Sequence, residues 1–125
     1  MKSKFNVSEA EREVLEKIWL FPEGIRQPEL LRVLEADGRQ WKRQTVNTFI
    51  ARMEDKGVVT REGKLVKAVY TRDEFDSSFI QDNIEELYGG KIRNLISALV
   101  KNNKIAEKDI NELKEFINTY EKGEL

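Results

Sequence analysis

One stretch of the sequence, residues 41–57, limits the possible folds most strongly, because its apolar side chains follow the period of an α-helix and the stretch ends at a glycine. Four apolar residues recur there at intervals of three and four positions, so they line one side of a helix: Val46, Phe49, Ile50 and Met53. Gly57 lacks a Cβ and so tolerates the left-handed conformation in which many helices end. The pattern predicts a helix over residues 42–56 with one buried face.

After Gly57 the pattern changes from the period of a helix to that of β-strands. Residues 58–61 and 66–71 are β-branched or alternate between apolar and polar side chains. Glu62-Gly63-Lys64 lies between them and reads as a short turn that contains a glycine. These residues predict a β-hairpin that directly follows the helix.

Two more helices are expected before residue 41. Ser8 and Glu11 have the spacing of a capping box, in which each side chain bonds the other residue's backbone amide. A second helix is expected to start at Pro28, whose fixed φ suits the first helical position, and to run to Asp37-Gly38. Three helices followed by a hairpin is the element order of a winged helix-turn-helix domain, which we place at residues 1–72. The predicted fold class is therefore mainly α with a small β-hairpin.

The net charge of −1 conceals a strongly basic segment that overlaps the third helix. Residues 38–72 carry nine basic and three acidic side chains, whereas residues 73–125 carry seven basic and twelve acidic ones. Such a concentrated positive patch is typical of proteins that bind a polyanion, and double-stranded DNA is the expected partner. The alternative is a winged-helix module that binds proteins rather than DNA. The basic segment argues against that alternative.

Polar and basic side chains around the third helix and the hairpin are the candidate DNA contacts. Four have short or forked hydrogen-bonding groups that can read base edges in a major groove: Gln44, Thr45, Asn47 and Thr48. Six cations are expected to contact phosphates: Lys42, Arg43, Arg52, Arg61, Lys64 and Lys67. The alternative is an ordinary solvated amphipathic helix beside an edge strand that carries lysine only for protection.

Residues 73–125 predict three further amphipathic helices, which form a second domain. A segment of this size buries too little surface to be stable alone. We therefore expect its apolar faces to meet a second copy of the chain in a homodimer: Phe79, Ile84, Leu87, Ile92, Leu95, Ile96, Leu99, Val100, Ile110, Leu113, Ile117 and Tyr120. Docking of these helices onto the winged-helix domain of the same chain is the alternative.

The sequence contains no cysteine and no histidine. Disulfides, thiolate metal sites, cysteine nucleophiles and Ser-His-Asp catalysis all lack an essential group. The carboxylates alternate with lysines on polar helix faces, which is ordinary helix support. We expect neither an enzyme nor a cofactor or metal site. No segment reads as a signal peptide or a membrane span, so we expect a soluble cytoplasmic protein that does not insert into membranes.

Three stretches carry a family resemblance that extends from Ser8 to Tyr120. The first is SEAEREVLEKIW at residues 8–19. The second consists of Trp41, TVNTFIARM at residues 45–53 and KG at residues 56–57. The third is YGG at residues 88–90, ahead of an apolar run. In these stretches the chain resembles the penicillinase-repressor family of bacterial winged-helix transcriptional repressors.

The resemblance implies a homodimer with an N-terminal DNA-binding domain and a C-terminal helical dimerisation domain. It implies binding to an inverted repeat in promoters of antibiotic-resistance genes. It also implies that a membrane sensor protease cuts an Asn-Phe bond, where this chain has Ala98-Leu99. We expect repression to end when the dimer is lost. A ligand or another partner is the alternative trigger.

Overall fold

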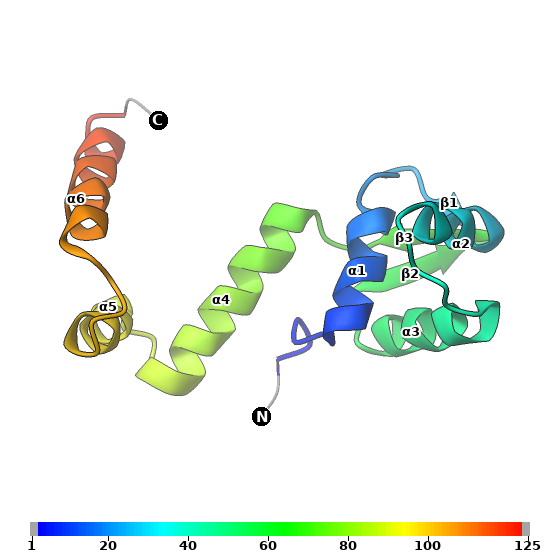
Figure 1. Ribbon diagram of the computed structural model, residues 1–125, viewed down its shortest axis with the longest axis horizontal. Coiled ribbons are helices and arrows are strands. Elements are labelled where there is room, and N and C mark those ends of the chain that lie inside the picture. The colour runs from blue at the N-terminus through cyan, green and yellow to red at the C-terminus, as the bar shows by residue number, and fades with distance from the viewer. Residues whose placement is uncertain (1–2, 124–125) are drawn as a thin grey trace. The chain divides into compact units, whose positions relative to one another are not determined.

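The computed structural model describes residues 3–123, and within that range the chain forms six helices and a three-stranded sheet (Figure 1). Its contacts divide it into two compact units, one up to Asp82 and the other from Asn83. The elements in chain order are α1 (Glu9–Ile18), β1 (Ile25–Arg26), α2 (Gln27–Ala36), α3 (Arg43–Asp55), β2 (Val59–Glu62), β3 (Leu65–Ala68), α4 (Arg72–Tyr88), α5 (Ile92–Lys101) and α6 (Glu107–Glu121).

The helix ends of the first unit follow the predicted signals. The Glu11 amide donates to Ser8 Oγ at 3.1 Å and the Ser8 amide donates to Glu11 Oε1 at 2.8 Å, so the predicted capping box is present at the start of α1. α2 carries its proline in the first turn, as expected, but begins one residue earlier, at Gln27. α3 is bounded by Lys42 and Lys56 as caps, which agrees with the predicted 42–56.

The hairpin is tighter than the sequence indicated, and it belongs to a larger sheet. Glu62 pairs with Leu65, so β2 and β3 are joined by the two residues Gly63 and Lys64. Gly63 has a φ of +60°, which suits a glycine in the first position of a two-residue hairpin loop. β1 pairs antiparallel with the other side of β3, giving the order β1-β3-β2. β1 was not predicted, because two residues are too few to show alternation.

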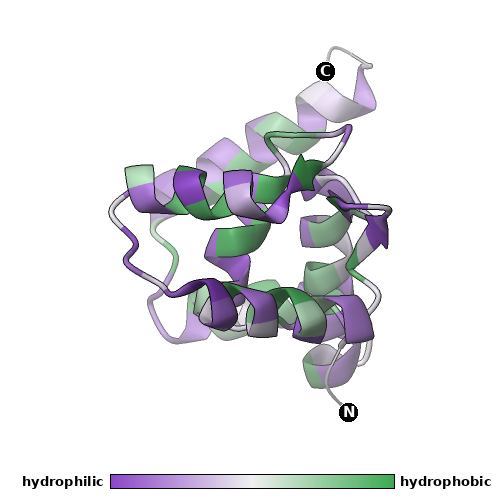
Figure 2. Cartoon of the chain, turned by 90° about the vertical axis from the view of Figure 1, so that its right-hand side faces the viewer, coloured by the Kyte–Doolittle hydropathy of each residue, from purple (hydrophilic) through white to green (hydrophobic). Residues whose placement is uncertain are grey.

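The core of the first unit is apolar and draws on every element up to the start of α4. Its buried members are Phe5, Val14, Leu15, Ile18, Ile25, Leu30, Leu34, Val46, Ile50, Met53, Val58, Val59, Val66 and Phe75. Figure 2 shows hydrophilic and hydrophobic residues on the same helices, as expected of helices with one buried face. Three of the four apolar residues predicted for the buried face of α3 are buried, and Phe49 is half-buried against the same core. The architecture is a winged helix-turn-helix.

The first turns of α4 belong to this core. Phe75 is 2% exposed and its ring makes edge-to-face contacts with Phe5 and Trp19, at centroid distances of 5.4 and 5.6 Å. Asp76 accepts two hydrogen bonds from the Arg12 guanidinium on α1, at 2.5 and 3.3 Å. The contact boundary after Asp82 therefore falls within α4, whereas the sequence-based division lies between residues 72 and 73, directly after the first residue of this helix.

In the second unit, α5 and α6 carry the apolar residues expected there, from Ile92 to Tyr120, but enclose no core. None of the residues of either helix is buried. Their large apolar side chains are exposed or half-buried instead, and Phe116, which was not predicted as part of an interface, is among the exposed ones. Within the second unit, the two helices therefore present apolar faces that its described residues leave exposed or only half-buried.

Candidate nucleic-acid interface

The outward side of α3 carries the four predicted base-reading residues. Gln44 and Thr48 are exposed, whereas Thr45 and Asn47 are half-buried. Thr48 Oγ1 donates to the Gln44 carbonyl oxygen at 3.1 Å, which uses its only proton and leaves its lone pairs free. The Asn47 and Gln44 side chains have no hydrogen-bond partner within residues 3–123. Both amides can therefore donate to and accept from an outside molecule.

The C-terminal end of α3 is held by an ion pair with a buried carboxylate. Lys56 Nζ lies 3.0 Å from Glu11 Oε1 and also donates to the Asn6 carbonyl at 3.3 Å. Glu11 is 2% exposed. Burial alone raises the pKa of this carboxyl, but hydrogen bonds from the Ser8 amide and Lys56 outweigh it and hold the pKa below its ordinary value. The charged pair fixes α3 against the start of α1.

The N-terminal end of α3, where the candidate base-reading residues lie, is braced by an aromatic cluster. The ring of Trp41 meets that of Phe49 edge to face at 5.2 Å. The Arg39 guanidinium lies over the Trp41 ring at 5.0 Å and donates to Glu13 on α1. These contacts tie the loop between α2 and α3 to the body of the unit. Trp41, directly before the N-cap of α3, is thus held against Phe49 of the same helix, and Arg39 is held against α1.

The hairpin, residues 59–68, is called the wing here. Its three predicted phosphate contacts differ in whether their side chains already have a partner. Arg61 donates to Glu54 on α3 and to Gln27 on α2, both at 3.3 Å. Lys67 pairs with Glu62 at 2.9 Å, and this hydrogen bond raises the pKa of Lys67. Lys64, in the loop, is exposed and has no partner among the described residues. Only Lys64 of the three is unengaged.

The remaining predicted phosphate contacts flank α3 and are available. Lys42, Arg43 and Arg52 are all exposed. None of them makes an ion pair or a side-chain hydrogen bond within residues 3–123. The structure therefore brings Lys42 and Arg43 to the same end of the helix as the candidate base readers. Arg52 lies near the opposite end.

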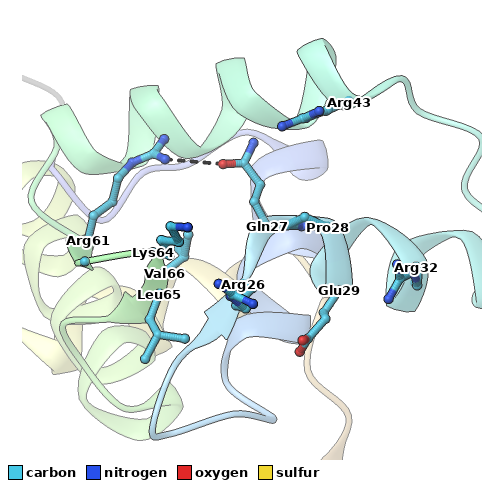
Figure 3. Close-up of a pocket in the computed structure, with 11 residues that line it drawn as sticks. Arg26, Gln27, Pro28, Glu29, Arg32, Arg43, Arg61, Lys64, Leu65 and Val66 are labelled. Carbon is cyan, nitrogen blue, oxygen red and sulfur yellow. Dashed lines mark hydrogen bonds between the residues drawn. The ribbon is translucent and has the colours of Figure 1, made fainter.

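A groove of about 680 Å³ lies between the first turns of α2 and α3 and the wing (Figure 3). Five cations line it: Arg26, Arg32, Arg43, Arg61 and Lys64. Glu29 is the one acidic residue of the lining. Arg26 and Arg32 were missed by the sequence analysis because both lie before the basic stretch at residues 38–72. We call this feature the α2–wing groove.

Two surfaces, each taken within its own unit, thus carry side chains that the described residues of that unit leave without a partner or uncovered. One is the end of α3 with the neighbouring groove, and the other is the apolar side of α5 and α6. Phe116 could have been found from its spacing, since it stands three residues after Leu113 and four before Tyr120. Among the described residues, no helix is both long and apolar enough to cross a membrane.

This arrangement of three helices and a wing defines the winged helix-turn-helix class of proteins. The sequence model of the penicillinase repressor family matches residues 7–119, and the chain belongs to that family. It is similar to the penicillinase repressor of Bacillus licheniformis, with 27% identity over 119 residues that cover 90% of each chain. The family is one of transcriptional repressors, which is not a class of enzyme.

Proposed function

We propose that this chain represses transcription as a homodimer bound to an inverted-repeat operator in the bacterial cytoplasm. One observation carries the proposal: the N-terminal part of α3 combines unpaired amide groups, on exposed Gln44 and half-buried Asn47, with exposed and unpaired cations. Amides can make paired hydrogen bonds to adenine in a major groove. Cations add affinity for phosphates that does not depend on sequence. The name of the similar Bacillus protein suggests that the regulated genes confer antibiotic resistance.

Within this proposal the side chains of α3 divide into two groups with different tasks. Gln44, Thr45, Asn47 and Thr48 read bases. Lys42, Arg43, Arg52 and Lys64 contact phosphates. Arg61 and Lys67, the other two predicted phosphate contacts, keep carboxylate partners in the free chain. They would have to exchange those partners to bind DNA, so we expect a smaller contribution from them.

The apolar sides of the C-terminal helices support dimerisation. Several predicted interface residues are exposed in the single chain: Leu87, Ile92, Val100, Leu113, Ile117 and Tyr120. Others are half-buried: Ile84, Leu95, Ile96, Leu99 and Ile110. Phe79 differs from both sets, because it packs against the core of the first unit. A second copy would cover the exposed side chains, and a two-fold dimer presents two α3 helices to an inverted repeat.

Repression would end when the dimer is lost. The Ala98-Leu99 bond lies within α5 and both side chains are half-buried. A sensor protease could reach it only after the helix opens locally. Intact mass measured during derepression separates this route from the alternative, because an intact chain throughout would leave a ligand or a partner as the trigger.

A gel shift with three duplexes tests the proposal: an inverted repeat from the promoter region, the same half-sites as a direct repeat, and a random sequence. We expect the inverted repeat to bind most tightly and the logarithm of the affinity to fall linearly with the logarithm of the salt concentration. Equal affinity for inverted and direct repeats would contradict the symmetric dimer. No binding to any duplex would favour the protein-interaction alternative.

A further inference from the structure

The arginines of the first unit fall into two groups according to whether a carboxylate pairs with them. Four have such a partner: Arg12 with Asp76, Arg39 with Glu13, Arg61 with Glu54 and Arg72 with Glu16. Four have none within the described residues: Arg26, Arg32, Arg43 and Arg52. Three of the unpaired four line the α2–wing groove. The unneutralised arginines are therefore gathered at one place rather than spread over the unit.

We propose that the α2–wing groove binds the phosphate backbone of one DNA strand, with Arg26 and Arg32 as phosphate ligands beside Arg43 and Lys64. This inference rests on the proposed function and extends it to two residues outside the predicted contact set. Like charges that converge on one groove repel each other in the free protein. Phosphates relieve this repulsion, and guanidinium groups bind their oxygens in a paired geometry.

The position of the groove favours DNA over a free anion. Arg43 lines the groove and is also the first residue of α3. Lys64 lines the opposite side and stands in the loop of the wing. The groove is therefore continuous with the helix that carries the candidate base readers. A strand whose bases face α3 would bring its phosphates along this path.

Arg61 has a positioning role in this groove rather than that of a ligand. Its guanidinium donates to Gln27 at the start of α2 (Figure 3) and also to Glu54 near the end of α3. Because Arg61 stands on β2, these two bonds fasten the wing to both helices. They set the width of the groove between α2 and the wing. Gln27 contributes to this without carrying a charge.

The test compares the salt dependence of operator binding for full-length variants. Arg26→Gln with Arg32→Gln keeps a polar, hydrogen-bonding side chain and removes two charges, whereas Arg26→Lys with Arg32→Lys keeps both charges. Lys101→Gln with Lys104→Gln makes the same change of net charge in the second unit. Each lost phosphate contact should lower the slope of log affinity against log salt by about 0.9, and a dimer has four of them. Raising the salt concentration from about 50 to 200 mM weakens operator binding by the parent chain. The same change should weaken binding by the Gln pair by a factor on the order of 10² less.

The expected result is a reduced slope for the Arg→Gln pair alone, with near-normal slopes for the lysine pair and for the control in the second unit. An unchanged slope in the Arg→Gln pair, with normal operator binding by the parent chain, overturns this inference and leaves the proposed function intact. Failure of the parent chain to bind any duplex overturns both. Thermal unfolding monitored by circular dichroism verifies that each variant is folded. If the Gln pair unfolds, Arg26→Gln and Arg32→Gln made singly test the charge, since each should lower the slope by about 1.8 in the dimer.

Two further measurements separate the roles within the groove. Gln27→Ala should weaken binding without changing the slope, because it loosens the wing and removes no charge; a reduced slope would contradict the positioning role of Arg61. Calorimetric titration with pyrophosphate at constant ionic strength tests the free-anion source. Saturable micromolar binding that the Arg→Gln pair abolishes, with operator binding unchanged in that pair, would assign the groove to a soluble anion and refute the DNA assignment.

Discussion

Replacing Phe75 by Ala should destabilise the winged-helix unit, although Phe75 stands on α4 beyond the predicted domain boundary. The side chain is 2% exposed and meets two aromatic rings edge to face. Truncating a buried Phe to Ala removes its transfer free energy and leaves a cavity, which together cost about 3–5 kcal/mol. The two ring contacts place the expected loss toward the upper end of that range.

The fragment 1–88 suits this measurement because it ends with α4 and lacks the apolar faces of α5 and α6. Urea unfolding followed by tryptophan fluorescence reports on Trp19, which lies next to Phe75, and on Trp41 of the same unit. Ile80→Ala on the same helix is the matched control, since Ile80 is 54% exposed and its truncation should change stability by less than about 1 kcal/mol. A loss for Phe75→Ala no larger than that for Ile80→Ala would refute the assignment of the start of α4 to this core.

The other predictions concern the boundary, an ion pair and the base readers. Fragment 1–72 should unfold at much lower urea than 1–88, because it lacks the buried ring of α4; equal midpoints would contradict this. The free-energy advantage of the parent chain over Glu11→Gln should be full above about pH 4.3 and shrink as pH falls further, because folding lowers the pKa of Glu11; an advantage that grows on acidification would refute it. Asn47→Ala should weaken binding to the operator by about 1–3 kcal/mol and leave binding to random duplex unchanged, whereas Lys64→Ala should weaken binding to both. If each variant lost as much affinity for random duplex as for the operator, the distinction between base readers and phosphate contacts would be wrong.

Local sequence signals predicted most of the elements because each signal acts within a few residues. The capping box at Ser8 and the apolar period of α3 depend on neighbours in the chain, and both were confirmed. β1 was missed because its only support is the pairing of Ile25 and Arg26 with β3, forty residues away in sequence. A segment of two residues is too short to show the alternation of apolar and polar side chains by which such a strand is predicted.

The candidate site was predicted in part for a similar reason. A count of charges along the chain identified the basic stretch, but it could not show which cations pair with carboxylates. Arg61 and Lys67 meet Glu54 and Glu62 in space, whereas Arg26 joins the groove through a fold that brings α2 beside the wing. Phe79 likewise reads as part of an amphipathic stripe, yet it packs on the first unit. In each case the outcome depends on contacts between residues that are brought together by the fold, which the order of residues along the chain does not show.

Because α5 and α6 contain no buried residue, the proposed homodimer would make their folding depend on protein concentration. If a second copy covers their apolar sides, mass action links the stability of these helices to the amount of chain present. Dilution would melt the C-terminal helices first and leave α1 to α3 folded. At concentrations above the dissociation constant of the dimer, the chains would be protected. At lower concentrations, monomers would expose their apolar helices to cellular proteases. A given relative increase in the rate of synthesis would then produce a larger relative increase in the steady-state concentration of the protein.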